Sequence, residues 1–105
     1  MAGTPAWKKI AQKGAVPKAR EGHSMSVVGR SLYLFGGTGD GDTCFQDLSV
    51  FDVASETWAP VKFSGAAPSK RNNHASAVVG TTIWIFGGFL DGLVGNDVYS
   101  FDTSR

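Results

Sequence analysis

Short apolar runs, separated by glycine and polar turns, recur along the chain and predict strands rather than helices. Residues 24–28 and 75–79 end at Gly29 and Gly80, and glycine is the residue that most readily adopts the backbone of a tight turn. No window shows the i, i+3, i+4, i+7 spacing of an amphipathic helix, so we expect essentially no helix.

Further runs complete the pattern of predicted strands. Residues 32–35 and 83–86 are continuous apolar segments closed by a Gly-Gly doublet, which is typical of strands buried on both faces. Two later segments carry a tryptophan, and Pro60 in one of them indicates an edge strand because proline lacks the N–H that a central strand donates. The remaining predicted strands are residues 7–10, 48–53, 57–61 and 98–101.

The predicted strands belong to two copies of one unit, because the chain nearly repeats itself. Past the glycine doublet the spacing of the copies falls from 51 to 50 positions, so the second copy has lost one residue there. A period near 50 residues is typical of repeat architectures, in which one unit needs neighbours to bury its apolar face. The pairs 51 positions apart include Trp7 and Trp58, Arg20 and Arg71, His23 and His74, and the doublets Gly36-Gly37 and Gly87-Gly88.

Each unit is expected to form four antiparallel strands, a to d, in the chain order d-abc-d-abc. The connections a–b and c–d are short, whereas b–c and d–a are long, and in an antiparallel sheet the long ones emerge at the same end. Binding residues usually lie on loops held by a rigid scaffold, so this end is the predicted interaction surface. The long connections are residues 11–22, 38–46, 62–73 and 89–96.

These features resemble the kelch repeat. The resemblance rests on the Gly-Gly doublets after an apolar strand, on the aromatic residues that follow them, on Trp58, and on the pre-strand segments 17–23 and 68–74. It covers nearly the whole chain and implies an all-β fold of kelch-type β-propeller blades, one four-stranded blade per repeat. The expected boundaries are a kelch repeat region 1–105, an outer strand d at 7–10, repeat one at 23–61 and repeat two at 74–102.

The number of repeats departs from the family pattern, because a closed propeller needs about four to eight blades and this chain has material for two. The second repeat also lacks its own outer strand, while the first residues supply one without a blade. Two explanations remain open: the chain is part of a longer propeller, or several copies close a ring in which each N-terminal strand completes a neighbour's blade. Three copies would give about six blades and four would give about eight.

Charge and cysteine content narrow the function classes. The formal net charge is +1 and the charged residues are scattered, so we expect neither a nucleic-acid partner nor a membrane partner. Cys44 is the single cysteine, which precludes an intrachain disulfide and favours a reducing compartment, cytoplasmic or nuclear. No apolar run approaches bilayer-spanning length.

The candidate partner-binding residues lie on the long connections. Arg20 and Arg71 could bind carboxylates of a partner through their planar guanidinium groups, but their recurrence in both repeats favours a structural role. Residues that differ between the repeats are better candidates for recognition, and the apolar ones could bind a partner or pack internally. The full set is Arg20, Glu21, Asp40, Asp42, Arg71, Asn72, Asn73, Phe89, Leu90 and Asp91.

Other suggestive residues are interpreted as structural, and we expect no catalytic, cofactor or metal site. The segment after Gly37 is glycine-rich but precedes no helix, which a phosphate loop requires. The histidines recur in register and lack ligand partners nearby, and the Asp40/Asp42 pair has too few further acidic residues for calcium. The residues assigned to the structural motif are Trp7, His23, Gly36, Gly37, Trp58, His74, Gly87 and Gly88.

The favoured function is a non-catalytic scaffold for protein–protein interactions, because the kelch resemblance implies loops that present a partner-binding face. A second hypothesis is a structural, engineered or excised module that self-assembles and has no partner of its own. A third is a metal-dependent enzyme, similar to galactose oxidase or to the plant specifier proteins. For that reading no complete ligand set is found around Cys44, Glu21 or the Asp40/Asp42 pair.

Overall fold

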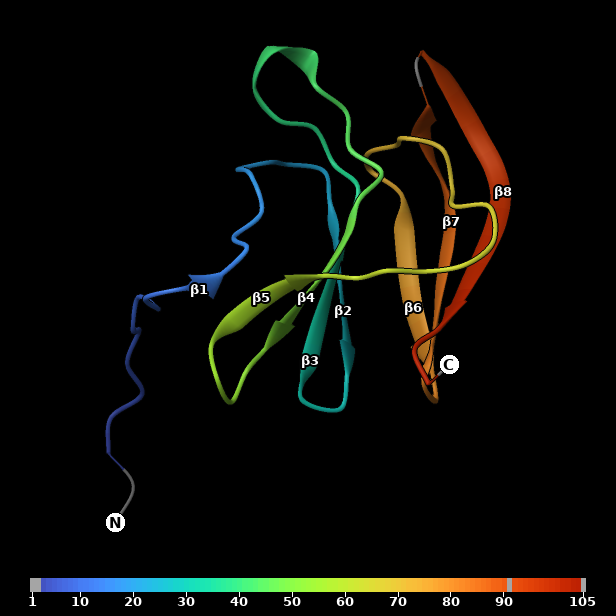
Figure 1. Ribbon diagram of the computed structural model, residues 1–105. Coiled ribbons are helices and arrows are strands. Elements are labelled where there is room, and N and C mark those ends of the chain that lie inside the picture. The colour runs from blue at the N-terminus through green and yellow to red at the C-terminus, as the bar shows by residue number, and fades with distance from the viewer. Residues whose placement is uncertain (1–2, 91, 105) are drawn as a thin grey trace.

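The computed structural model describes residues 3–90 and 92–104 and shows two sheets side by side (Figure 1). In the first blade the order is β5-β4-β3-β2, all antiparallel, and the short β1 joins β5 in parallel. The second blade has the antiparallel order β6-β7-β8. The strands are β1 Lys13–Gly14, β2 Ser24–Val28, β3 Ser31–Phe35, β4 Leu48–Asp52, β5 Thr57–Pro60, β6 Ala75–Val79, β7 Thr82–Leu90 and β8 Leu93–Asp102.

The all-β fold and its antiparallel blades are confirmed, and the inner strands β2 and β6 have the predicted bounds. Pro60 pairs with Ser49 at the outer end of β5, beyond the two positions where β1 joins that strand. Its missing N–H is therefore tolerated there. The single departure from strands and loops within the described residues is one 3-10 turn, Asp40–Asp42.

The hydrophobic core lies between the two blades. Phe35 of the first blade packs with Ile83 and Ile85 of the second, and all three side chains are buried. Burying a side chain of this size contributes about 1.5–3 kcal/mol, so this contact is the main apolar interaction that holds the blades together. The partly buried residues around the three are Val28, Tyr33, Leu48, Val78 and Phe101.

The segment 89–96 corrects one prediction, because it is a β-hairpin and not a long loop. Strands β7 and β8 continue past Gly88, after an irregularity in register between Phe86 and Gly88. Phe89 pairs with Val94 and Leu90 pairs with Leu93, so the ladder extends to the tip. The second segment pairs as a continuous ladder, whereas the 38–46 segment of the first repeat pairs only through an isolated bridge between Thr38 and Cys44 and a few turn hydrogen bonds.

Residues 7–10, the expected outer strand, form no strand within this chain. Trp7 is fully exposed, and in Figure 1 the N-terminal stretch runs away from both sheets. A strand requires a partner edge, and the prediction placed that partner in another copy or another part of a propeller. The strand that does form nearest this end is β1, whose Lys13 pairs with Thr57.

The long connections gather at one end, as predicted from the strand order. In Figure 1 the 36–47 loop, the tip of the β7–β8 hairpin and the entry to β2 lie at one end, and the short turns lie at the other. Two isolated bridges tie this end together, one between Glu21 and Thr38 and the other between Asn72 and Phe89. They occupy equivalent positions in the two repeats, so both repeats fix their loop end in the same way.

The first glycine doublet sits at the junction between the blades. Gly36 has φ of 70°, and a Cβ there would lie 2.8 Å from both the Arg71 carbonyl oxygen and His74 Cε1. The next amide, Gly37 N–H, donates to the same Arg71 carbonyl at 2.9 Å. Only glycine allows the second blade this close an approach at that backbone conformation.

Gly36→Ala and Gly29→Ala separate the cost of crowding from the cost of backbone strain. Gly29 also has positive φ, 59°, but a Cβ there meets nothing within 4 Å. We expect Gly29→Ala to cost about 1 kcal/mol of unfolding free energy. Gly36→Ala should cost about 2–4 kcal/mol, since overpacking adds to strain. Urea unfolding of both variants tests this, and equal losses would contradict the role given to Gly36.

Candidate functional site

Arg71 is the centre of the loop end of the second blade. Its side chain is fully buried and donates to both carboxylate oxygens of Asp97, each at 2.9 Å. It also donates to the carbonyls of Gly87 at 2.9 Å and Ser69 at 3.2 Å. The guanidinium lies 5.5 Å from the centre of the Tyr99 ring. The N–H donors of the guanidinium group are therefore used inside the chain and not by a partner.

Arg20 repeats the arrangement in the first blade. It donates to the two oxygens of Asp47 at 2.7 and 3.1 Å and to the Gly36 carbonyl at 3.1 Å, and its Cζ lies 4.0 Å from the Phe45 ring centre. Its side chain is 4% exposed. The donors of Arg20 and Arg71 are used inside the chain, which favours the structural interpretation of both residues, and we call each arginine with its aspartate a clamp.

The Arg71–Asp97 pair shifts the acid–base behaviour of both members. The hydrogen bond to Asp97 raises the pKa of Arg71, and the same bond lowers the pKa of Asp97 below its ordinary 3.8. A carboxyl whose folded pKa is lowered stabilises the fold above its ordinary pKa and loses that contribution as the pH falls through the folded value. The clamp therefore persists throughout the neutral and mildly acidic range.

The two histidines occupy different environments despite their repeat equivalence. His74 is buried, its Nε2 lies 2.8 Å from Ser24 Oγ across the blade junction, and its ring meets Phe35 edge-on with centroids 5.4 Å apart. Burial lowers the pKa of His74 below its ordinary 6.5, and the positive charge of Arg71 lowers it further. His23 is exposed.

The remaining polar candidates are on the surface of the loop end. Glu21, Asp40, Asp42 and Asn73 are exposed and Asn72 is partly exposed. Asn73 has φ of 54° and its amide donates to the Gly22 carbonyl at 2.7 Å, so the backbones of the two d–a segments are in contact. The structure therefore brings these residues from both repeats to one surface, where their side chains face solvent.

The tip of the β7–β8 hairpin adds four apolar side chains to this surface. Phe89 is 46% exposed, Leu93 74% and Val94 85%, while Leu90 is partly covered. Leu93 and Val94 belong to the same apolar 89–96 segment as Phe89 and Leu90, but they were not among the candidate partner-binding residues. Asp91 lies outside the described residues. We call these four residues, Phe89, Leu90, Leu93 and Val94, the hairpin tip.

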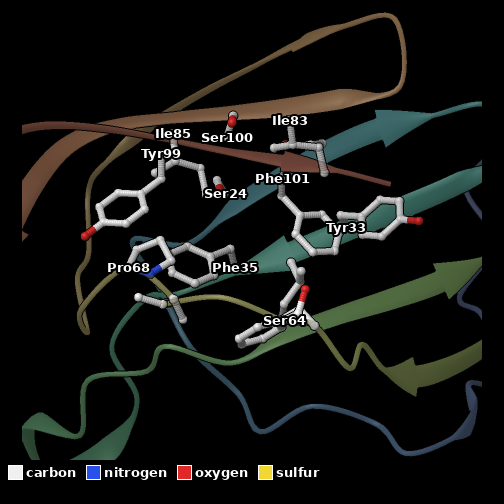
Figure 2. A pocket seen from close by; sticks show the side chains of 15 residues that line it. Ser24, Tyr33, Phe35, Ser64, Pro68, Ile83, Ile85, Tyr99, Ser100 and Phe101 are labelled. Carbon is white, nitrogen blue, oxygen red and sulfur yellow. The ribbon is translucent and has the colours of Figure 1, made fainter. Parts of the chain in front are cut away.

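A pocket that sequence reasoning missed lies between the blades (Figure 2). Its volume is about 80 Å³, and the rings of Phe35 and Phe101 line it together with Ile83 and Ile85. The d–a segment that contains Pro68 forms one wall. Pockets that bind small molecules are typically several times larger, about 300–1,000 Å³, so we interpret this one as a packing gap in the core.

Metal-ligating side chains are not gathered anywhere in residues 3–90 and 92–104, where no group of three or more His, Cys, Asp or Glu is found. Cys44 is a partly buried free thiol in the 36–47 loop. The part of the chain that the structure describes contains no helix with the length and hydropathy needed to span a bilayer.

Comparison with known proteins places this geometry in context. A family model described as "KLHDC2/KLHL20/DRC7 Kelch-repeats domain" matches residues 2–105. The chain is 36% identical over 95 residues to Kelch domain-containing protein 3 of Bos taurus, covering 89% of this chain and 25% of that protein. It is 33% identical over 102 residues to Kelch repeat-containing protein 2 of Saccharomyces cerevisiae, covering 88% of this chain and 12% of that protein.

A relative with an enzyme name is also similar. The chain is 39% identical over 102 residues to N-(sulfonatooxy)prop-2-enimidothioate sulfolyase of Thlaspi arvense, covering 94% of this chain and 29% of that protein. The chain thus spans less than a third of the length of each of these three relatives.

Arg71→Met should destabilise the protein far more than Arg30→Met. Losing the buried guanidinium leaves the Asp97 carboxylate and two backbone carbonyls without their donor, so we expect a loss of about 3 kcal/mol in unfolding free energy. Arg30 is exposed, and its replacement should change stability by less than about 0.5 kcal/mol. Urea unfolding at pH 7 gives both values, and a similar loss in both variants would contradict the clamp.

Stability should fall as the pH drops below 6.5, and His74→Gln should reduce that fall. Because the folded pKa of His74 lies below 6.5, the unfolded chain takes up the proton first, so the contribution is complete above 6.5 and lost on acidification. Urea midpoints at pH 7.5 and 5.5 measure the effect. His23→Gln is the matched control and should keep most of the wild-type dependence, because the charge of His23 is the smallest of the influences on the pKa of His74. An unchanged dependence in His74→Gln would refute the assignment.

Proposed function

The chain belongs to the kelch repeat family, and from that premise we propose that it is a non-catalytic scaffold that binds a protein partner at its loop end. Kelch repeats generally mediate protein–protein interactions, and the blade provides a rigid base for the segments that emerge from it. The proposal has three parts: the chain binds a protein partner, it catalyses no reaction, and it acts in the cytoplasm or the nucleus.

The observation that carries the proposal is the hairpin tip. Phe89, Leu93 and Val94 are large apolar side chains that remain exposed on an ordered, paired β-hairpin. Exposed apolar residues held in fixed positions and surrounded by polar groups are typical of a protein contact site. Arg20 and Arg71 lie beneath this surface and hold its base through their bonds to Asp47 and Asp97.

The polar surroundings indicate the chemistry of the partner. The 3-10 turn at the same end exposes Asp40 and Asp42, and Glu21 is exposed at the start of the first blade. A partner segment that carries both an apolar side chain and a lysine or arginine would complement a loop end with an apolar tip and exposed carboxylates. We therefore propose a basic, partly apolar protein segment as the ligand of the loop end.

A second candidate function is self-assembly without another partner, including a ring of three or four copies. The observation that favours it is apolar surface away from the loop end: Val27 is 60% exposed on the first blade, and Trp84 is 43% and Phe86 51% exposed on the second. A metal-dependent enzyme is not proposed. The sulfolyase name belongs to a relative of which this chain covers 29%, and the candidate residues share no ligand set.

The loop-end proposal is tested by comparing the proteins captured by wild-type and variant chains. Leu93→Ser/Val94→Ser should lose the specific partner by about tenfold or more, because exposed anchors contribute about 1–2 kcal/mol each. Val53→Ser is the control, since Val53 is similarly exposed at 48% and lies in the short turn between β4 and β5, away from the long connections. Cross-linking followed by quantitative mass spectrometry provides the measurement. Equal capture by all three chains would overturn the loop-end assignment.

A further inference from the structure

The contact between the two blades serves as a template for a second contact of the same kind. Within the chain, Tyr33 and Phe35 of β3 face Ile83 and Ile85 of β7 across the core. Each blade therefore contributes a different face: the first presents its aromatic face and the second presents its aliphatic face. The opposite faces of both blades remain outside this contact.

The repeat makes these opposite faces equivalent to the faces already paired. Leu32 and Leu34 of the first blade correspond to Ile83 and Ile85, 51 positions later, and alternate with Tyr33 and Phe35 along β3. The free face of the first blade is thus a second aliphatic face. By strand register it contains Met25, Val27, Leu32, Leu34, Ser49 and Phe51, and we call it the leading face. Met25 and Val27 on this face are exposed, whereas Leu34 and Ser49 are already buried within the chain.

The free face of the second blade is a second aromatic face. Trp84 and Phe86 correspond to Tyr33 and Phe35, and their exposure of 43% and 51% contrasts with the burial of Phe35 at 5%. By strand register this face contains Ala75, Ala77, Val79, Trp84, Phe86 and Val98, and we call it the trailing face. The leading and trailing faces are therefore related in the same way as the two faces that form the core.

We propose that a second copy of the chain packs its leading face onto the trailing face of the first, head to tail. This inference rests on the self-assembly offered above as the second candidate function and specifies its interface. Such a contact uses two different surfaces of the chain, so it is heterologous, and repetition of the step closes a ring when the rotation allows.

The side chains at the proposed contact are more apolar than those of the template. Within the chain, Ser26 Oγ donates to Ser76 Oγ at 3.2 Å at the blade junction. The equivalent positions in the proposed contact are Ala77 of one copy and Met25 of the next. An apolar pair at this position can be buried without satisfying any hydrogen bond, so the substitution favours association.

The second glycine doublet leaves space for the histidine of a second copy. In the template, the His74 ring lies where a Cβ of Gly36 would be, with Cε1 at 2.8 Å. At the equivalent Gly87 a Cβ would meet only the Gly95 backbone, and His23, the counterpart of His74, is exposed. The proposed contact places His23 of the second copy over Gly87 of the first.

The same second copy can also supply the missing outer strand. In the first blade β5 pairs with β4 in a register that places Trp58 opposite Phe51, with ring centroids 5.0 Å apart. The equivalent pair is Trp7 and Phe101, and Trp7 is fully exposed on a segment that joins neither sheet. Since β8 is the edge of its sheet, residues 7–10 of the second copy would extend it.

The experiment uses two variants, each of which blocks one face. Trp84→Asp alters the trailing face and Val27→Asp, 60% exposed, alters the leading face. Light scattering after size exclusion should give a wild-type mass of several times 11.1 kDa and a monomer for either variant alone. An equimolar mixture should recover a species of about twice the monomer mass, because each variant retains the one face that the other has lost.

The controls distinguish loss of the head-to-tail interface from loss of self-assembly in general and from misfolding of a variant. Val53→Asp, at an exposed site outside both faces, should assemble as the wild type does. Circular dichroism verifies that each variant is folded, and Phe86→Lys replaces Trp84→Asp if the latter does not fold. A monomeric wild type overturns self-assembly and this inference together. An oligomeric wild type whose variants assemble unchanged, or whose mixture does not recover the dimer, overturns only the head-to-tail interface.

Discussion

The buried guanidinium of Arg71 is the interaction on which the rest of the structure depends. Its side chain binds Asp97 and the Gly87 carbonyl, which joins the start of the inner strand to both ends of the hairpin within one blade. Its backbone carbonyl accepts from Gly37 of the other blade. A buried charge is tolerated only when its donors are satisfied. Arg71 therefore fixes the positions of the three chain segments that it binds.

Much of this architecture could be predicted from the sequence because its causes are local. Alternating and continuous apolar runs, closed by glycines, located β2 and β6 at their observed bounds and separated long connections from short turns. The repeat also predicts two blades, since a period of about 50 residues implies units that bury their faces against each other. These inferences need only the periodicity of side chains along a strand and the backbone freedom of glycine.

The chemistry of the candidate site was less accessible, because it depends on which groups meet in space. Arg20 and Arg71 carry the same charge and stand at the same repeat positions whether they bind a partner or an aspartate of their own blade. Only the bidentate contacts to Asp47 and Asp97 decide between the two. The hairpin was missed for a related reason: a segment rich in glycine and apolar residues has no clear strand periodicity, and its ladder becomes visible only from the pairing of Phe89 with Val94 and of Leu90 with Leu93.

In each repeat the arginine binds residues at both ends of the segment between the glycine doublet and the aspartate. The blade is therefore held together independently of the sequence within that segment. In the first repeat Arg20 holds Gly36 on one side and Asp47 on the other, and the chain between them leaves the sheet as a polar loop. In the second repeat the same grip encloses a compact hairpin. Because the closure entropy of a loop grows only slowly with its length, foreign sequences could be grafted at the exposed Asp40–Asp42 turn, which leaves Thr38 paired with Glu21 and Phe45 in contact with Arg20. The sequence of this loop can therefore vary while the structure of the blade is kept.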